Sequence, residues 1–148
     1  RLTAFPRSTP AGVALLTISA LWFAGLVEFT DLGDFTSMRN KFLVLTVAAY
    51  GLTLRFVSEF LAVRALGMVL LLAAEPLLEA AWMRPESGRL WLVALVYVWI
   101  LCALFFIGMP YLLRDAIAWV QKSGPRWKAV ALAGIAYGAV LLGIRASL

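Results

Sequence analysis

The chain has 148 residues, of which 64% are hydrophobic and only 14% charged. An average soluble domain is about 45–50% apolar and about 25% charged, and a protein this small could not cover so much apolar side chain with its own surface. The formal net charge of +5 comes from basic residues spread over short segments between apolar stretches, which favours orientation in a membrane over nucleic-acid binding. The composition therefore predicts a single all-α domain dissolved in a lipid bilayer.

The cysteine and histidine counts exclude several kinds of chemistry. The chain has one cysteine, Cys102, and no histidine. An internal disulfide, a His-ligated haem or zinc, a histidine general base and a paired-cysteine metal centre are therefore ruled out within this chain. We accordingly predict no catalytic residues, no metal site, no bound cofactor and no enzymatic activity.

The first apolar stretch predicts a membrane span over 10–28. Thr9 is a suitable N-cap, and Pro10 fits the first helical position because its missing N–H is not needed there. About 17 uncharged residues follow, which is near the minimum for crossing a bilayer. The basic residues before the stretch resemble those of a signal peptide, but the exit LWFAGLVEF lacks a small-residue cleavage site, so a retained anchor is favoured.

Residues 42–82 form one long apolar stretch that must fold back. As a straight helix it would be about 60 Å long, roughly twice the hydrocarbon thickness of a bilayer. The turn is expected between Arg55 and Arg64, where the charges gather. This predicts a second span over 41–57 and a third over 64–82.

The remaining chain predicts two more spans and one helix that lies in the membrane plane. After the turn MRPESGR (83–89), residues 90–109 are uncharged and give the strongest transmembrane signal. Residues 111–122 carry apolar side chains at helical spacing but are too short and too charged to cross, which is typical of an interfacial amphipathic helix. The last span is predicted over 128–144. We thus expect five spans, with four as the fallback.

Charge asymmetry predicts the orientation of the protein. With five spans and the N-terminus inside, the inner segments hold eight Lys and Arg residues and the outer segments hold five. Positive charge is retained on the cytoplasmic side. The sequence therefore predicts a multi-pass protein of the bacterial inner membrane with a cytoplasmic N-terminus.

An acidic residue interrupts the third span, in the stretch LLLAAEPLLEAAW (70–82). If Trp82 marks the interface, Glu75 lies about 10 Å deeper along the helix axis. An acid at that depth must be protonated, paired or in contact with water. Pro76 cannot donate a hydrogen bond to the carbonyl of Leu72, which predicts a helix kink and a free acceptor beside the acid.

Glu75 and Glu79 are one turn apart and so share a helix face, which predicts a small intramembrane polar site. Three interpretations of Glu75 compete. It is a buried contact with a neighbouring helix or another subunit, a proton- or ion-handling carboxylate, or a residue near water beyond a misplaced span boundary. The first is favoured, because a transporter working alone usually has more polar residues than the first, fourth and fifth spans contain.

Small residues recur four apart in the last span. The pairs are Gly134-x-x-x-Gly138 and Ala139-x-x-x-Gly143. Such GxxxG-type spacing lets two helix backbones approach closely, so these residues are predicted to pack against another helix of this chain or of a partner. The simpler alternative is that glycine is common in membrane helices.

Two aromatic residues, Tyr97 and Trp99, are predicted to lie deep in the fourth span. Their polar tips need hydrogen-bond partners there. Such a surface could contact a bound lipid, quinone or pigment, although aromatic packing within the bilayer is the simpler interpretation.

Together these patterns favour a non-catalytic integral membrane subunit, or an assembly partner, of a larger membrane protein complex. It would dock through its third and fifth spans, with the bilayer and other membrane subunits as partners and no nucleic acid. The alternative is a small proton- or ion-coupled membrane transporter that uses Glu75.

Overall fold

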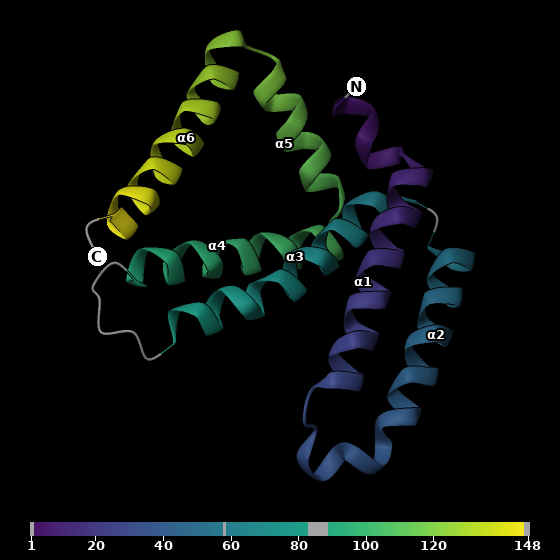
Figure 1. The fold of residues 1–148 in the computed structure, drawn as a ribbon. Helices are drawn as coiled ribbons and strands as arrows, with labels where there is room; N and C mark the ends of the chain where they lie inside the picture. Colours follow the sequence, from purple (N-terminus) through teal and green to yellow (C-terminus); the bar gives the residue numbers. More distant parts are fainter. Residues whose placement is uncertain (1, 58, 83–88, 147–148) are drawn as a thin grey trace.

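The computed structural model describes residues 2–57, 59–82 and 89–146, and the surroundings of side chains within residues 5–57, 59–82 and 89–140. All regular elements among these residues are helices, so the predicted all-α class is confirmed for this part of the chain (Figure 1). The elements are η1 (Leu2–Arg7), α1 (Thr9–Phe29), η2 (Gly33–Met38), α2 (Arg39–Phe56), α3 (Leu61–Ala81), α4 (Arg89–Gly108), α5 (Tyr111–Gln121) and α6 (Gly124–Ala146).

Helices α1 and α2 form an antiparallel hairpin. The cap of α1 is Ser8, one residue before the expected Thr9, and its side chain accepts a hydrogen bond from the Ala11 N–H at 3.4 Å. The connection reverses direction through η2, where Gly33 adopts φ +53°, a conformation that glycine enters without steric cost. Across the hairpin the hydroxyls of Thr17 and Tyr50 lie 2.9 Å apart and form a hydrogen bond.

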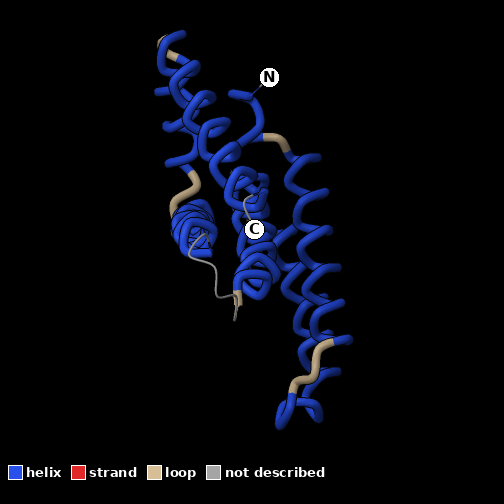
Figure 2. Tube along the Cα trace, turned by 60° about the vertical axis from the view of Figure 1, so that its left-hand side comes forward, coloured by secondary structure: helices blue, strands red, loops and turns tan. Residues whose placement is uncertain are grey.

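Helices α3 and α4 form a second antiparallel hairpin, which crosses the first at a steep angle (Figures 1 and 2). Small residues allow this crossing. A Cβ atom on Gly12 of α1 would lie 2.8 Å from the backbone nitrogen of Ala62 in α3, and Gly67 makes a similarly close approach to α4. The buried core gathers at this crossing around Leu16, Leu61 and Ala65. Helix α3 therefore joins the two hairpins.

Helices α5 and α6 extend from this core as an arm (Figure 1). Helix α6 contacts α4 through a hydrogen bond in which the Tyr137 hydroxyl donates to the carbonyl of Trp91 at 2.7 Å. In α5, Arg114 pairs with the adjacent Asp115 at 2.8 Å. Helix α5 matches the short helix expected over 111–122, and its place in the membrane plane stays a prediction.

Three of the described helices, α1, α3 and α4, are long and apolar enough to cross a membrane. These three support the predicted membrane class, but the prediction of five spans is not confirmed. The segment predicted as the second span is helical, as α2, but is not among the three. The segment predicted as the fifth span is helical, as α6, but the surroundings of its residues are described only as far as residue 140. Helix α2 carries Arg39, Lys41 and Arg55, and each basic residue adds a large cost to insertion.

Candidate functional site

The predicted acidic site lies at the C-terminal half of α3, where it borders α4. Glu75 and Glu79 face the same hollow, as their spacing of four residues predicts. The hollow has a volume of about 530 Å³ and is open to the surroundings of the protein. Its wall consists of Leu71, Ala74, Glu75, Leu78, Glu79 and Trp82 from α3 and Ile100 from α4.

Glu75 has no partner within the described residues. Its side chain is exposed, and no hydrogen bond or ion pair to it is found among residues 5–57, 59–82 and 89–140. It lies six positions before the end of α3 at Ala81, which corresponds to about 9 Å along the axis. Half of a hydrocarbon core is about 15 Å thick. If α3 spans the bilayer, the carboxyl group lies within the hydrocarbon and has no partner from the described part of its own chain.

Pro76 lies inside α3, and the helix continues beyond it to Ala81. Because proline has no N–H, the carbonyl of Leu72 loses its usual helical donor. Pro76 is itself exposed, as Glu75 is. The expected helix kink and free acceptor stay predictions.

The two aromatic residues predicted in the fourth span are not brought together. Tyr97 is 59% exposed, whereas the indole nitrogen of Trp99 is buried and has no hydrogen-bond partner among the described residues. Neither residue lines the acidic hollow or the apolar groove described below. Their contact with a lipid, quinone or pigment stays a prediction.

The small residues of α6 do not pack within the described chain. A Cβ atom on Gly134 or Gly138 would meet no other residue within 4 Å, and Ala139 is exposed. Gly143 belongs to α6, but its surroundings lie outside the described residues. GxxxG packing within the chain is therefore not supported, and the close approaches occur instead at Gly12 and Gly67.

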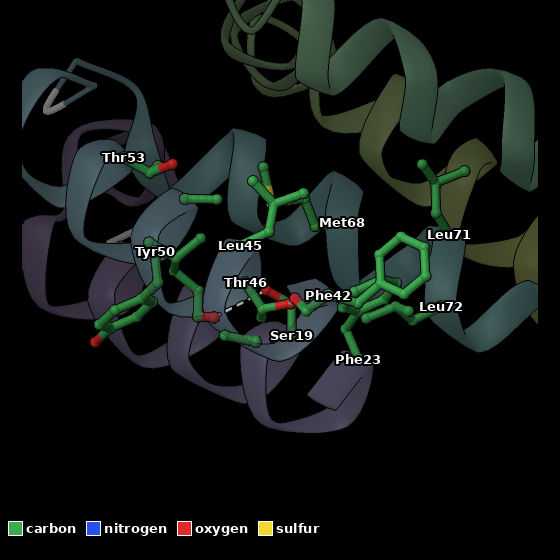
Figure 3. Close-up of a pocket in the computed structure, with 13 residues that line it drawn as sticks. Ser19, Phe23, Phe42, Leu45, Thr46, Tyr50, Thr53, Met68, Leu71 and Leu72 are labelled. Carbon is green, nitrogen blue, oxygen red and sulfur yellow. Dashed lines mark hydrogen bonds between the residues drawn. The ribbon is translucent and has the colours of Figure 1, made fainter. Parts of the chain in front are cut away.

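An apolar groove between α1, α2 and α3 was missed by sequence reasoning. It has a volume of about 550 Å³ and is lined mainly by alkyl and aromatic side chains (Figure 3). The lining positions of α2, from Phe42 to Thr53, recur at spacings of three and four residues. That spacing marks a helix face, but only the packing of three helices shows that the face borders a groove.

No known protein family, curated protein or solved structure matches this chain. Among the described residues, no three side chains of His, Cys, Asp or Glu come together to hold a metal ion. Two carboxyl groups on one face of a membrane-length helix can accept hydrogen bonds, pair with a cation or exchange a proton.

Proposed function

We propose that this protein is a non-catalytic integral membrane subunit that docks onto a partner membrane protein through the hollow around Glu75. One observation carries the proposal: Glu75 lies on a membrane-length helix, is exposed, and has no partner among the described residues. A charged side chain at the centre of a membrane helix costs about 2.5–3.5 kcal/mol on insertion scales. A partner helix that offers a hydrogen-bond donor or a basic side chain would offset that cost.

The hollow has the composition of a helix-docking surface. Leu71 and Leu78 supply apolar contact on either side of Glu75, and Ile100 adds a contact from α4. Glu79 lies two residues from the end of α3, about 3 Å along the axis, where water or headgroups can reach it. Glu75 is therefore the residue whose carboxyl group depends on the partner.

Helix α6 offers a second docking face. Gly134 and Gly138 face open space, so the backbone of another helix could approach them closely and gain dispersion contacts. This role of the small residues requires a partner chain, because the described part of the protein does not cover them.

Site-specific photocrosslinking in the intact membrane tests the docking surface. A photoreactive amino acid at Leu78, in the hollow, should crosslink to a second membrane protein. The same amino acid at Leu101, which is 56% exposed on α4 but does not line the hollow, serves as the control. Glu75→Leu should reduce the Leu78 crosslink at least fivefold. Equal crosslinking at both positions, or an unchanged crosslink in Glu75→Leu, would contradict the proposal.

Glu75→Gln separates this function from the alternative, a proton- or ion-coupled transporter. Glutamine retains the ability to accept a hydrogen bond but cannot ionise. The Leu78 crosslink should therefore survive Glu75→Gln if the partner donates a hydrogen bond. If the purified protein instead carries protons into vesicles loaded with a pH-sensitive dye, and Glu75→Gln abolishes that flux, the transporter is the correct function.

A further inference from the structure

The groove between α1, α2 and α3 has an apolar wall and shares Leu71 with the acidic hollow. Its wall includes Phe23 of α1, Phe42, Ala49 and Tyr50 of α2, and Met68 and Leu72 of α3. Figure 3 shows these side chains arranged along the groove, with Phe23 and Phe42 near one end and Tyr50 and Thr53 near the other. A volume of about 550 Å³ lies within the range of about 300–1,000 Å³ that ligand sites occupy.

Most of the hydroxyl groups in the wall are already engaged. Ser19 donates to the carbonyl of Leu16 at 2.9 Å, and Thr46 donates to the carbonyl of Phe42 at 2.8 Å. The Tyr50 hydroxyl is bonded to Thr17. Because these hydroxyl groups already have hydrogen-bond partners, they do not need one from a bound molecule. The groove therefore favours an alkyl chain over a polar molecule.

The length of the groove suits an alkyl chain. Its wall on α2 runs from Phe42 to Thr53, eleven residues further along the chain, which is about 16 Å along the helix axis. That length is close to the half-thickness of a hydrocarbon core, about 15 Å. The groove is therefore long enough to hold one acyl chain within a single leaflet.

A basic residue lies just beyond the Phe42 end. Arg39 is three residues before Phe42 and so shares its helix face. Its guanidinium donates to the carbonyl of Thr30 at 3.2 Å, while its Nε atom is buried and has no partner among the described residues. Lys41 is nearby in the sequence and exposed. Guanidinium groups bind phosphate through two or more hydrogen bonds.

Acidic residues share this end of the hairpin. They are Glu28, Asp31 and Asp34, and all three are exposed. The Asp31 carboxylate already accepts a hydrogen bond from the Gly33 N–H at 3.0 Å. Opposite charges at one end suit a zwitterionic headgroup, in which a phosphate and an ammonium group are joined.

We propose that the groove holds one acyl chain of a glycerophospholipid, with the phosphate directed toward Arg39. The lipid would fill the space between the α1–α2 hairpin and α3 and would be retained when the protein is extracted from the membrane. Three observations support it together: the apolar wall, the length that matches one leaflet, and the incompletely bonded arginine at one end.

Native mass spectrometry of the full chain, purified in a mild detergent, tests the acyl chain. The protein should carry one phospholipid per chain. Ala49→Trp fills the groove and should lower the lipid-bound fraction at least tenfold. Ala48→Trp makes the same change at an exposed neighbour that does not line the groove, and it should leave that fraction unchanged. Equal lipid binding in the two variants would overturn the proposal.

The headgroup is tested with a second pair of variants and with lipid extraction. Arg39→Gln should lower the lipid-bound fraction about fivefold, whereas Arg55→Gln, an exposed residue at the other end of α2, should not change it. The extracted lipid should contain phosphate. A quinone or other phosphate-free lipid, no bound lipid at all, or a homodimer that Ala49→Trp disrupts would each overturn the proposal. These outcomes do not depend on whether a partner docks at Glu75.

Discussion

Gly67 of α3 lies directly against the backbone of Ala103 in α4: a Cβ atom placed on Gly67 would lie 2.8 Å from the Ala103 carbonyl oxygen. The same atom would lie 2.8 Å from Cγ1 of Ile107. Because a backbone carbonyl cannot rotate aside as the end of a side chain can, the two helices would have to separate. The absence of a side chain at this position fixes the distance between α3 and α4.

We therefore expect Gly67→Ala to destabilise the protein by about 1–3 kcal/mol, the usual cost of forcing extra volume into a packed contact. The matched control is Gly51→Ala in α2, where a Cβ atom meets nothing within 4 Å. That change should be neutral or should stabilise the helix by about 0.5–1 kcal/mol. Unfolding in mixed micelles, followed by tryptophan fluorescence, measures both. Equal effects of the two substitutions would show that the close approach is absent.

The hydrogen bond between Thr17 and Tyr50 should stabilise the α1–α2 hairpin. Tyr50→Phe removes it without changing the ring, and we expect a loss of about 0.5–1.5 kcal/mol. Tyr97→Phe is the control, because Tyr97 is exposed and makes no hydrogen bond among the described residues. A double-mutant cycle with Thr17→Val isolates the pairwise energy. A coupling energy near zero would contradict the bond.

Phe60, between α2 and α3, has φ 55°, in the left-handed region that side chains disfavour. Phe60→Gly and Phe60→Ala remove the same ring, including its approach to Arg114 at 6.0 Å, but only alanine keeps a Cβ atom. The glycine variant should therefore be the more stable of the two, by about 1 kcal/mol. Thermal unfolding in detergent compares them. An alanine variant as stable as the glycine variant would show that the left-handed turn is not retained.

Cys102 reports directly on whether α4 crosses the bilayer. It is the only cysteine in the sequence and is exposed on α4, six residues from the helix end at Gly108 and so about 9 Å from it. In intact membranes a charged maleimide should not reach it, whereas it should react after denaturation in SDS. Ser37→Cys in η2, combined with Cys102→Ala, should react without denaturation. Labelling of Cys102 in intact membranes would contradict the span.

Helix positions were largely predictable from the sequence, because long uncharged runs are bounded by charged or turn-forming residues. The strongest signal, 90–109, differs from α4 by one residue at each end. The span count was not predictable in the same way. Helix α2 has an apolar centre between Arg39, Lys41 and Arg55, and apolar length alone does not distinguish such a helix from a membrane-crossing one.

Only the part of the candidate site that lies on α3 was predictable from the sequence. Helical spacing placed Glu75 and Glu79 on one face of α3, and the structure places both in one hollow. The contribution of Ile100 from α4 and the whole groove depend on contacts between distant segments, which periodicity does not encode. The close approaches at Gly12 and Gly67 were also missed, because the sequence around a glycine in an apolar run does not show which helix it will pack against.

The two halves of α3 differ in what surrounds them. Leu61, Ala62, Val63, Ala65 and Gly67 are buried, whereas Glu75, Pro76, Glu79 and Ala80 are exposed. A mutational screen that measures cellular abundance and partner co-purification separately should therefore give different results for the two halves of this helix. Substitutions in its first two turns should lower the abundance of the protein itself. Substitutions at the exposed Glu75, Glu79 and Ala80 should leave its abundance intact and change only which proteins co-purify with it.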